Sequence, residues 1–239
     1  MKLVVVVPAY NAARFLPNLV HRLVAAQPPG LFRVVIVDDG SSDATAEAAR
    51  DVASTIPNLE VVVRPTNGGY GAAMKTGLEA ARRLNADRAA SVHADGQYCP
   101  EALADLLVAL DRQNLDLLQG SRIAGGQALA GGMPLYKFAG NWVLNKIERW
   151  ALSLPLTDFH SGYLVYGQRA LGEIPFASLS DSFDFDIEVI AAARARGLAV
   201  GEAPIPTHYG DEVSYLNPLT YGLRVLRVLW RFKRGVYRA

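Results

Sequence analysis

A run of apolar, mostly β-branched residues near the N-terminus constrains the fold more than any other feature of this sequence. Leu3 to Val7 are followed directly by Pro8, and such an uninterrupted run is typical of a strand buried on both faces of a parallel sheet. A second β-branched run stands at residues 34–37, and shorter predicted strands follow at 61–63, 89–92 and 115–118. Segments with helical spacing separate them, which predicts an α/β fold with a mostly parallel, doubly wound sheet.

The regular alternation of predicted strands and helices ends after Arg122. Residues 123–133 are rich in glycine and lack periodicity, which indicates a mobile loop. Beyond this loop we expect helices at 134–152, 185–196 and 218–234, and strands at 163–166 and 200–205. We expect one domain over residues 1–217, followed by an amphipathic basic helix over residues 218–239.

Length and composition fit a single domain without a membrane span. The chain has 239 residues, of which 51% are hydrophobic, enough for a sizeable core. Its 24 basic and 23 acidic residues give a net charge of +1, so no long-range field attracts nucleic acid. Cys99 is the single cysteine, and no apolar stretch reaches the roughly 20 residues of a spanning helix. A cytoplasmic protein is expected.

Polar and glycine-rich segments follow the first predicted strands at their carboxyl ends, where an open parallel sheet binds its ligands. These segments are Pro8-Ala9-Tyr10-Asn11, Asp38 to Asp43, Asn67 to Gly71 and His93 to Gln97. We expect them to line one crevice. A Rossmann dehydrogenase would need G-x-G-x-x-G after the first strand, and this chain has no glycine there.

Two of these segments have both a structural and a functional interpretation. Asp38 and Asp39 are adjacent carboxylates that repel each other unless donors or a cation meet them, and a nucleoside offers such donors. Residues 41–43 could simply form a turn and helix cap. Gly68, Gly69 and Gly71 either form a tight turn or let the backbone approach a ligand at a helix N-terminus.

Asp95 and Gln97 form a candidate metal site. They supply hard oxygen ligands two residues apart at a strand end, which suits Mg²⁺ or Mn²⁺ held partly by substrate phosphates. An exposed Asp-Gly turn would give the same pattern. The prediction of a metal site therefore depends on the position of these residues directly after the fourth predicted strand.

Taken in order along the chain, these segments resemble glycosyltransferase family 2, and Gly120-Ser121-Arg122 completes the set. Further segments are similar to the dolichol-phosphate mannosyltransferase-like branch, which comprises polyprenyl-phosphate glycosyltransferases. They are Gly132 to Lys137, Asn141, Leu156 to Asp158 and Ser161 to Tyr163. The resemblance covers residues 1–210.

The resemblance implies an A-type glycosyltransferase fold with a Rossmann-like nucleotide-binding half. It implies a metal-dependent, inverting hexosyltransferase that uses Mg²⁺ or Mn²⁺ and a nucleoside-diphosphate sugar donor, with a polyprenyl (lipid) phosphate as the foremost acceptor. The positions it places at the donor are Pro8, Ala9, Tyr10, Asn11, Asp38, Asp39, Gly68, Gly71, Ala94, Asp95 and Gly96. Those it places at the metal are His93, Asp95 and Gln97. Arg122 and Lys137 would lie near the acceptor phosphate, and Asp158 near the reaction centre.

Two positions depart from the family pattern. His93 stands where the family has the first Asp of its Asp-x-Asp motif, which removes a negative charge and leaves two interpretations, a buried hydrogen-bonded histidine or a metal ligand. Ala12 stands where the branch has Glu, which puts the base of the nucleoside in doubt.

Two rival functions stay open. A soluble transferase could act on a hydroxyl of a saccharide or small molecule, with Asp158 or His160 as the base that takes its proton. A nucleotide-sugar-binding protein without catalysis would also fit the two departures. Residues 180–188 carry the acids Asp181, Asp184, Asp186 and Glu188, which belong either to a solvated loop or, for one of them, near the sugar or acceptor. Residues 208–215 could form a lid.

The last predicted helix carries arginines at 224, 227, 231 and 234 along one stripe and apolar residues almost all around it. It could pack into the domain, form a homodimer contact, or lie on a membrane with its arginines at lipid phosphates. Because the apolar arc is too wide for one packing surface, we hypothesise peripheral docking at the inner membrane face.

Overall fold

The computed structural model describes residues 1–95, 98–126, 135–206 and 218–238, with the side chains of 135–139 and 218–219 outside that description. Its centre is a seven-stranded sheet in the order β3-β2-β1-β4-β6-β5-β7. The strands are β1 (Leu3–Ala9), β2 (Leu31–Asp38), β3 (Leu59–Val63), β4 (Arg88–Ser91), β5 (Leu117–Ser121), β6 (Leu164–Tyr166) and β7 (Val200–Pro204).

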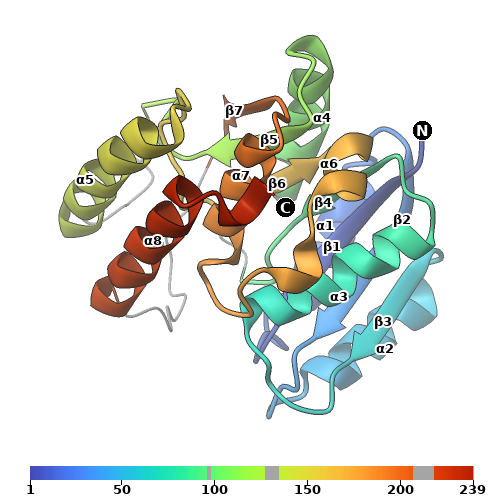
Figure 1. Cartoon of the computed structure of the whole chain (residues 1–239). Coiled ribbons are helices and arrows are strands. Elements are labelled where there is room, and N and C mark those ends of the chain that lie inside the picture. The colour runs from blue at the N-terminus through green and yellow to red at the C-terminus, as the bar shows by residue number, and fades with distance from the viewer. Residues whose placement is uncertain (96–97, 127–134, 207–217, 239) are drawn as a thin grey trace.

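Helices cover both faces of this sheet (Figure 1). They are α1 (Leu16–Ala25), α2 (Thr45–Thr55), α3 (Tyr70–Arg83), α4 (Leu103–Arg112), α5 (Leu135–Leu152), α6 (Gln168–Glu173), α7 (Phe185–Ala195) and α8 (Pro218–Lys233). Short 3-10 turns lie at Pro100–Ala102, Phe176–Ser178 and Val236–Arg238. The strands and helices predicted from the sequence are therefore present, whereas α6 was not predicted.

Strand β1 shows why the sheet is buried on both sides. All seven of its residues are buried. Val4 and Val6 belong to the apolar core on one face, and Leu3, Val5 and Val7 to the core on the other, because side chains alternate along a strand. This arrangement confirms the sequence prediction of a strand buried on both faces.

The pairing is parallel except at one strand. β1 pairs in parallel with β2 and β4, β2 with β3, and β5 with β7. β6 lies between β4 and β5 and runs antiparallel to both. The sheet is thus mostly parallel, as predicted, and the carboxyl ends of β1 to β4 lie along a common edge.

Helices α5 and α8 form a layer of their own. Figure 1 shows them side by side, on the opposite side of the molecule from α2 and β3, with α8 between α5 and α7. Within the described ranges, no helix is both long and apolar enough to cross a membrane. The expected boundary at residue 217 and the lid at 208–215 fall outside the described residues, as does most of the glycine-rich segment 123–133.

Candidate active site

Hydrogen bonds join the segments that follow β1 and β2. The Asn11 backbone N–H donates to the Ser41 hydroxyl at 2.9 Å, and the Asn11 side-chain oxygen accepts the Ser42 backbone N–H at 2.9 Å. Asn11 has a φ of 50°, a left-handed conformation that asparagine tolerates better than most residues. Tyr10 beside it is 39% exposed.

The adjacent carboxylates of Asp38 and Asp39 are buried and point to different donors. Asp38 accepts hydrogen bonds from the backbone N–H and the hydroxyl of Ser41. Asp39 accepts from Arg64 at 2.5 Å, from the Gly68 N–H at 3.1 Å and from the Gly69 N–H at 2.8 Å. Protein donors thus relieve the repulsion that the sequence indicated, and contact of either carboxylate with a nucleoside stays a prediction.

The glycine segment packs against a distant part of the chain. Gly69 has a φ of 98°, which favours glycine. A Cβ built on Gly71 would lie 2.3 Å from the Ser180 carbonyl oxygen, and the Ala72 N–H donates to the Asp181 carbonyl at 3.2 Å. The close backbone approach at Gly71 is therefore to the segment before α7. Ligand contacts of Gly68 and Gly71 stay predictions.

Three polar side chains meet between the start of α3, the segment after β4 and the start of α7. The Tyr70 hydroxyl donates to Asp186 at 3.1 Å and lies 3.0 Å from the Nε2 atom of His93. Burial raises the pKa of Asp186 to about 7, against the hydrogen bond from Tyr70, which lowers it. Burial also lowers the pKa of His93 below its usual range, although the nearby Asp95 charge opposes this. The imidazole is therefore neutral at neutral pH.

The candidate metal residues fit a cation that is shared with a substrate. Asp95 offers a carboxylate at the edge of the sheet, close enough to affect the pKa of His93. His93 already has the Tyr70 hydroxyl at one ring nitrogen, and Gln97 and Gly96 lie outside the described residues. Among the described residues no group of three His, Cys, Asp or Glu side chains is placed to hold a metal. One carboxylate with substrate phosphates is a common way to bind Mg²⁺.

Arg122 and Asp158 form a buried ion pair. The guanidinium donates to both carboxylate oxygens, from Nε at 2.7 Å and from the second terminal nitrogen at 2.9 Å. Asp158 is fully buried and also accepts the backbone N–H groups of Arg122 and His160. Burial alone would raise the pKa of Asp158, but the Arg122 charge and hydrogen bonds outweigh it and hold the pKa below its usual range. Asp158 therefore holds the Arg122 side chain in one orientation.

His160 lies in a second buried cluster. Its Nδ1 is 2.9 Å from the Tyr221 hydroxyl of α8. Its Nε2 is 3.1 Å from the carboxylate of Glu148 on α5, without the alignment of a hydrogen bond. Glu148 is fully buried. His160 thus lies between α5 and α8, which fits a structural role better than that of a base.

The four acids of residues 180–188 have three different surroundings. Asp181 is exposed and pairs with Lys75 of α3 at 3.0 Å. Asp184 and Glu188 face α8, where they pair with Arg224 and Arg231. Glu188 is fully buried and also accepts from the Tyr237 hydroxyl at 2.5 Å. Asp186 instead contacts Tyr70 in the site. The sequence did not separate Asp186 from its neighbours, although i,i+4 spacing places 184 and 188 on one side of a helix.

The remaining predicted site residues are only partly described. Pro8, Ala9 and Ala94 are buried beside the edge. The side chain of Lys137, near the start of α5, lies outside the described residues, so its place near the acceptor phosphate stays a prediction.

An α/β sheet whose loops gather at the carboxyl ends of neighbouring parallel strands is the arrangement of proteins that bind nucleotides at that edge. A family model described as "Glycosyl transferase family 2" matches residues 4–174. The chain therefore belongs to glycosyl transferase family 2, which confirms the resemblance found in the sequence.

Two curated relatives cover most of this chain. Polyprenol monophosphomannose synthase of Mycolicibacterium smegmatis is 31% identical over 203 residues, 84% of this chain and 75% of that protein. UDP-N-acetylglucosamine–dolichyl-phosphate N-acetylglucosaminyltransferase of Methanococcus voltae is 29% identical over 218 residues, 86% of this chain and 85% of that protein. Both names describe transfer of a sugar involving a polyprenol or dolichyl phosphate.

Solved structures show the fold. Glucosyl-3-phosphoglycerate synthase of Mycobacterium tuberculosis aligns with a TM-score of 0.71 at 17% identity, covering 97% of this chain and 80% of that chain. The same enzyme in complex with Mn²⁺, uridine-diphosphate-glucose and phosphoglyceric acid aligns with a TM-score of 0.66 at 17% identity, covering 97% and 79%. The A-type glycosyltransferase fold predicted from the sequence is confirmed.

Proposed function

We propose that this chain transfers a sugar from a nucleoside-diphosphate sugar to the phosphate of a polyprenyl lipid. The curated relatives support the acceptor class, and the solved complex with Mn²⁺ and a uridine-diphosphate sugar supports the donor class and a divalent cation. The observation that carries the proposal is the Arg122 guanidinium, which a fully buried Asp158 holds in place.

The charges at the site suit a phosphate acceptor. A lipid phosphate is already deprotonated near neutral pH, so its attack on the anomeric carbon requires positioning by a cation and no general base. Arg122 supplies such a cation, and Asp158 prevents the guanidinium from rotating away. Asp158 and His160 were the expected bases for a hydroxyl acceptor, but both are engaged by protein partners.

Asp95 would hold the divalent cation together with the donor diphosphate. When bound, this cation supplies positive charge to the leaving group as the anomeric bond breaks. The family resemblance further predicts inversion at the anomeric carbon, which NMR of the product would check. A product with the donor's configuration would contradict it.

A second candidate function rests on Asp186. Its pKa of about 7 suits a general base, so a hydroxyl acceptor close to Tyr70 and His93 would have a group that can take its proton. Replacing Asp186 by Asn separates the two functions, because transfer to a phosphate would continue without this carboxyl and transfer to a hydroxyl would not.

The test is an assay with labelled uridine, guanosine and thymidine diphosphate sugars, each with polyprenyl phosphate or phosphoglycerate, in Mn²⁺ or in chelator. We expect lipid-linked product with one donor, lost in chelator and reduced about 100-fold or more in Asp95→Asn and Arg122→Lys. Asp51→Asn and Arg50→Lys, which alter exposed residues of α2, are the matched controls and should retain full activity.

Two outcomes would contradict the proposal. Product with phosphoglycerate alone would assign the chain to hydroxyl acceptors. Donor binding without transfer to any acceptor would indicate a nucleotide-sugar-binding protein.

A further inference from the structure

All three tryptophans of the chain are exposed, and all three lie on the layer formed by α5 and α8. Trp142 is 53% exposed, Trp150 78% and Trp230 60%. Tryptophan is a large apolar side chain that is normally well buried in a soluble domain. Three exposed copies on one layer therefore indicate a surface that something apolar covers.

Aliphatic side chains extend this apolar surface. Its exposed members are Val143 and Ile147 on α5 and Leu223 and Leu226 on α8. The opposite side of α8 is also apolar, and its residues Val225, Val228 and Leu229 are buried against the rest of the protein. The wide apolar arc seen in the sequence thus serves two surfaces, one internal and one external.

A basic side chain lies against each tryptophan ring. Lys146 Nζ is 3.6 Å from the ring centre of Trp142, Lys233 Nζ is 5.1 Å from that of Trp150, and the Arg234 guanidinium carbon is 5.3 Å from that of Trp230. The contact between Lys233 and Trp150 also shows that the C-terminal ends of the two helices are adjacent.

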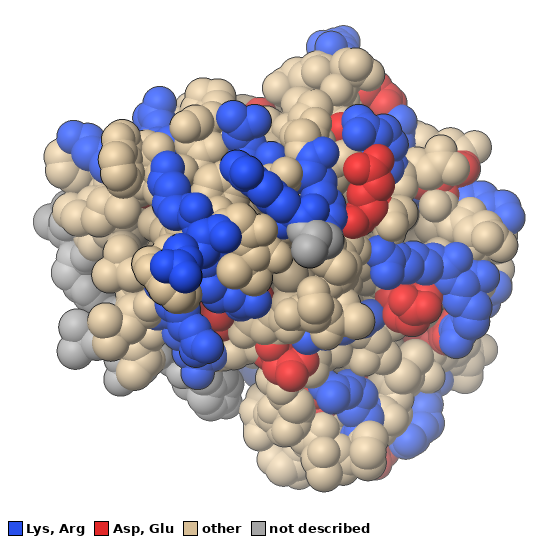
Figure 2. All heavy atoms as spheres, viewed as in Figure 1, with Lys and Arg blue, Asp and Glu red and all other residues tan. Residues whose placement is uncertain are grey.

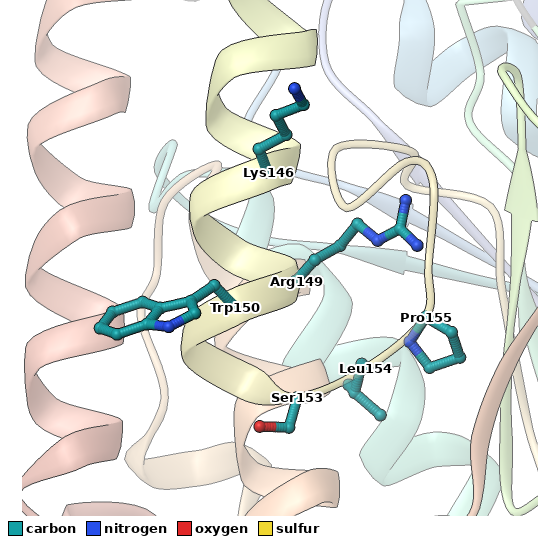
Figure 3. A pocket seen from close by; sticks show the side chains of 6 residues that line it. All are labelled: Lys146, Arg149, Trp150, Ser153, Leu154 and Pro155. Atoms are coloured by element: carbon teal, nitrogen blue, oxygen red, sulfur yellow. The ribbon is translucent and has the colours of Figure 1, made fainter.

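The external surface is basic as well as apolar. The sequences of α5 and α8 contain a single acidic residue, Glu148, and it is fully buried. Figure 2 shows Lys and Arg forming a band across this side of the molecule, where acidic atoms are sparse. Figure 3 shows Lys146 and Arg149 on α5 beside an open hollow, with Trp150 pointing toward α8.

The arginine stripe of α8 is divided between the two sides. Arg224 and Arg231 pair with Asp184 and Glu188 and so attach the helix to α7. Arg227 and Arg234 are exposed on the same side as Trp230. Arg224 and Arg231 therefore hold α8 against α7, whereas Arg227 and Arg234 are exposed and can contact an external partner.

We propose that the outer surface of α5 and α8 binds the face of an anionic lipid bilayer, with both helices lying flat in the headgroup region. Tryptophan and leucine enter the boundary between headgroups and acyl chains, and the basic side chains meet lipid phosphates. A second copy of the chain fits this surface poorly, because two identical faces would bring basic residues together without acids to pair with them. The inference goes beyond the proposed function, since binding to a bilayer needs neither donor nor transfer.

Co-sedimentation of the full chain with vesicles tests this proposal. We expect binding to vesicles of phosphatidylcholine with phosphatidylglycerol, weaker binding to phosphatidylcholine alone, and release at high salt. The variant Lys233→Glu with Arg234→Glu should bind anionic vesicles at least tenfold more weakly, since each basic residue contributes separately. The variant Arg50→Glu with Arg112→Glu makes the same charge change at exposed residues of α2 and α4 and should bind as the unmodified chain does.

A third variant tests the apolar part. Replacing Trp142, Trp150 and Trp230 by Ser should abolish binding while circular dichroism stays unchanged. If this variant fails to fold, the charge variants decide, because their side chains are exposed. Absence of binding at low salt, or equal loss in both charge variants, would overturn the proposal. A dimer by light scattering that the Trp variant abolishes would assign the surface to a second copy instead.

Discussion

The edge of the sheet at β1 to β4 and the layer of α5 and α8 arrange polar and apolar side chains in opposite ways. At the edge, carboxylates such as Asp39 lie in loops and receive backbone N–H donors from the next loop. In the helical layer, Glu148 is fully buried while Trp142 and Trp150 are exposed.

This difference indicates how each region is completed. At the edge, the neighbouring loops supply hydrogen-bond donors to the buried carboxylates of Asp38 and Asp39, so these carboxylates need no external partner. The helical layer buries its one acidic residue, Glu148, and leaves its tryptophans and several of its basic side chains exposed. The first region agrees with the proposed binding of a small polar donor, and the second with the proposed contact with a bilayer.

The largest expected change in unfolding free energy comes from breaking an ion pair, and one pair from each half of the chain is compared. Arg122→Ala leaves the fully buried Asp158 without its cation and should cost about 3–5 kcal/mol of unfolding free energy. Arg64→Ala removes a cation that is 25% exposed, and Asp39 keeps two N–H donors from the glycine loop, so the expected cost is about 1–2 kcal/mol. Urea unfolding of both variants measures the difference. Equal costs would mean that the two halves hold their carboxylates in the same way.

The second prediction concerns pH and Asp186. Its pKa is raised to about 7 in the folded chain, whereas an unfolded aspartate titrates near 3.9. The unfolded chain therefore loses this proton first, and the stability that the group contributes below pH 4 is lost as the pH rises to about 7. Asp186→Asn should remove this loss, with a gain on the order of 3 kcal/mol at pH 8 and a smaller one at pH 5. Unfolding at the two pH values checks it; the same gain at both would exclude titration of Asp186 as the cause.

The smallest expected changes in stability are those of two glycine-to-alanine substitutions, which should have opposite signs. Gly71→Ala places a Cβ against the Ser180 carbonyl and should destabilise the chain by about 1–3 kcal/mol through displacement of the segment before α7. Gly172→Ala in α6 meets nothing within 4 Å and should stabilise by about 0.4–1 kcal/mol, because alanine favours the helix. Thermal unfolding distinguishes the signs. If Gly71→Ala were neutral, the contact between the edge and the α7 segment would be adaptable.

The order of strands and helices was predictable chiefly because β1 and β2 contain continuous apolar runs and segments with helical spacing separate the strands. Leu3 to Val7 cannot alternate with polar residues when both faces of β1 are covered, so the pattern itself reports burial. The antiparallel direction of β6 was not predictable. This strand has only three residues, Leu164–Tyr166, and local pattern carries no information on direction.

The candidate site also has features that the sequence predicted and features that it did not. Loops at strand ends were predictable, because topology places them on a common edge whatever their side chains do. The contact of Tyr70 with Asp186 joins residues separated by 116 positions, and that of His160 with Tyr221 by 61. Such contacts depend on how α7 and α8 pack, which no local pattern records. The spacing of Asp184 and Glu188 was the one signal that could have assigned them to the opposite side of α7 from Asp186.

The position of the tryptophans has a practical consequence for spectroscopy. With all three on α5 and α8, ultraviolet emission excited at the indole band reports on that layer and hardly at all on the edge of the sheet. Donor binding should leave the emission spectrum nearly unchanged, whereas transfer of the indole rings into a less polar medium should shift it to shorter wavelength. The chain thus carries an intrinsic optical probe for one of its two surfaces and needs an added label for the other.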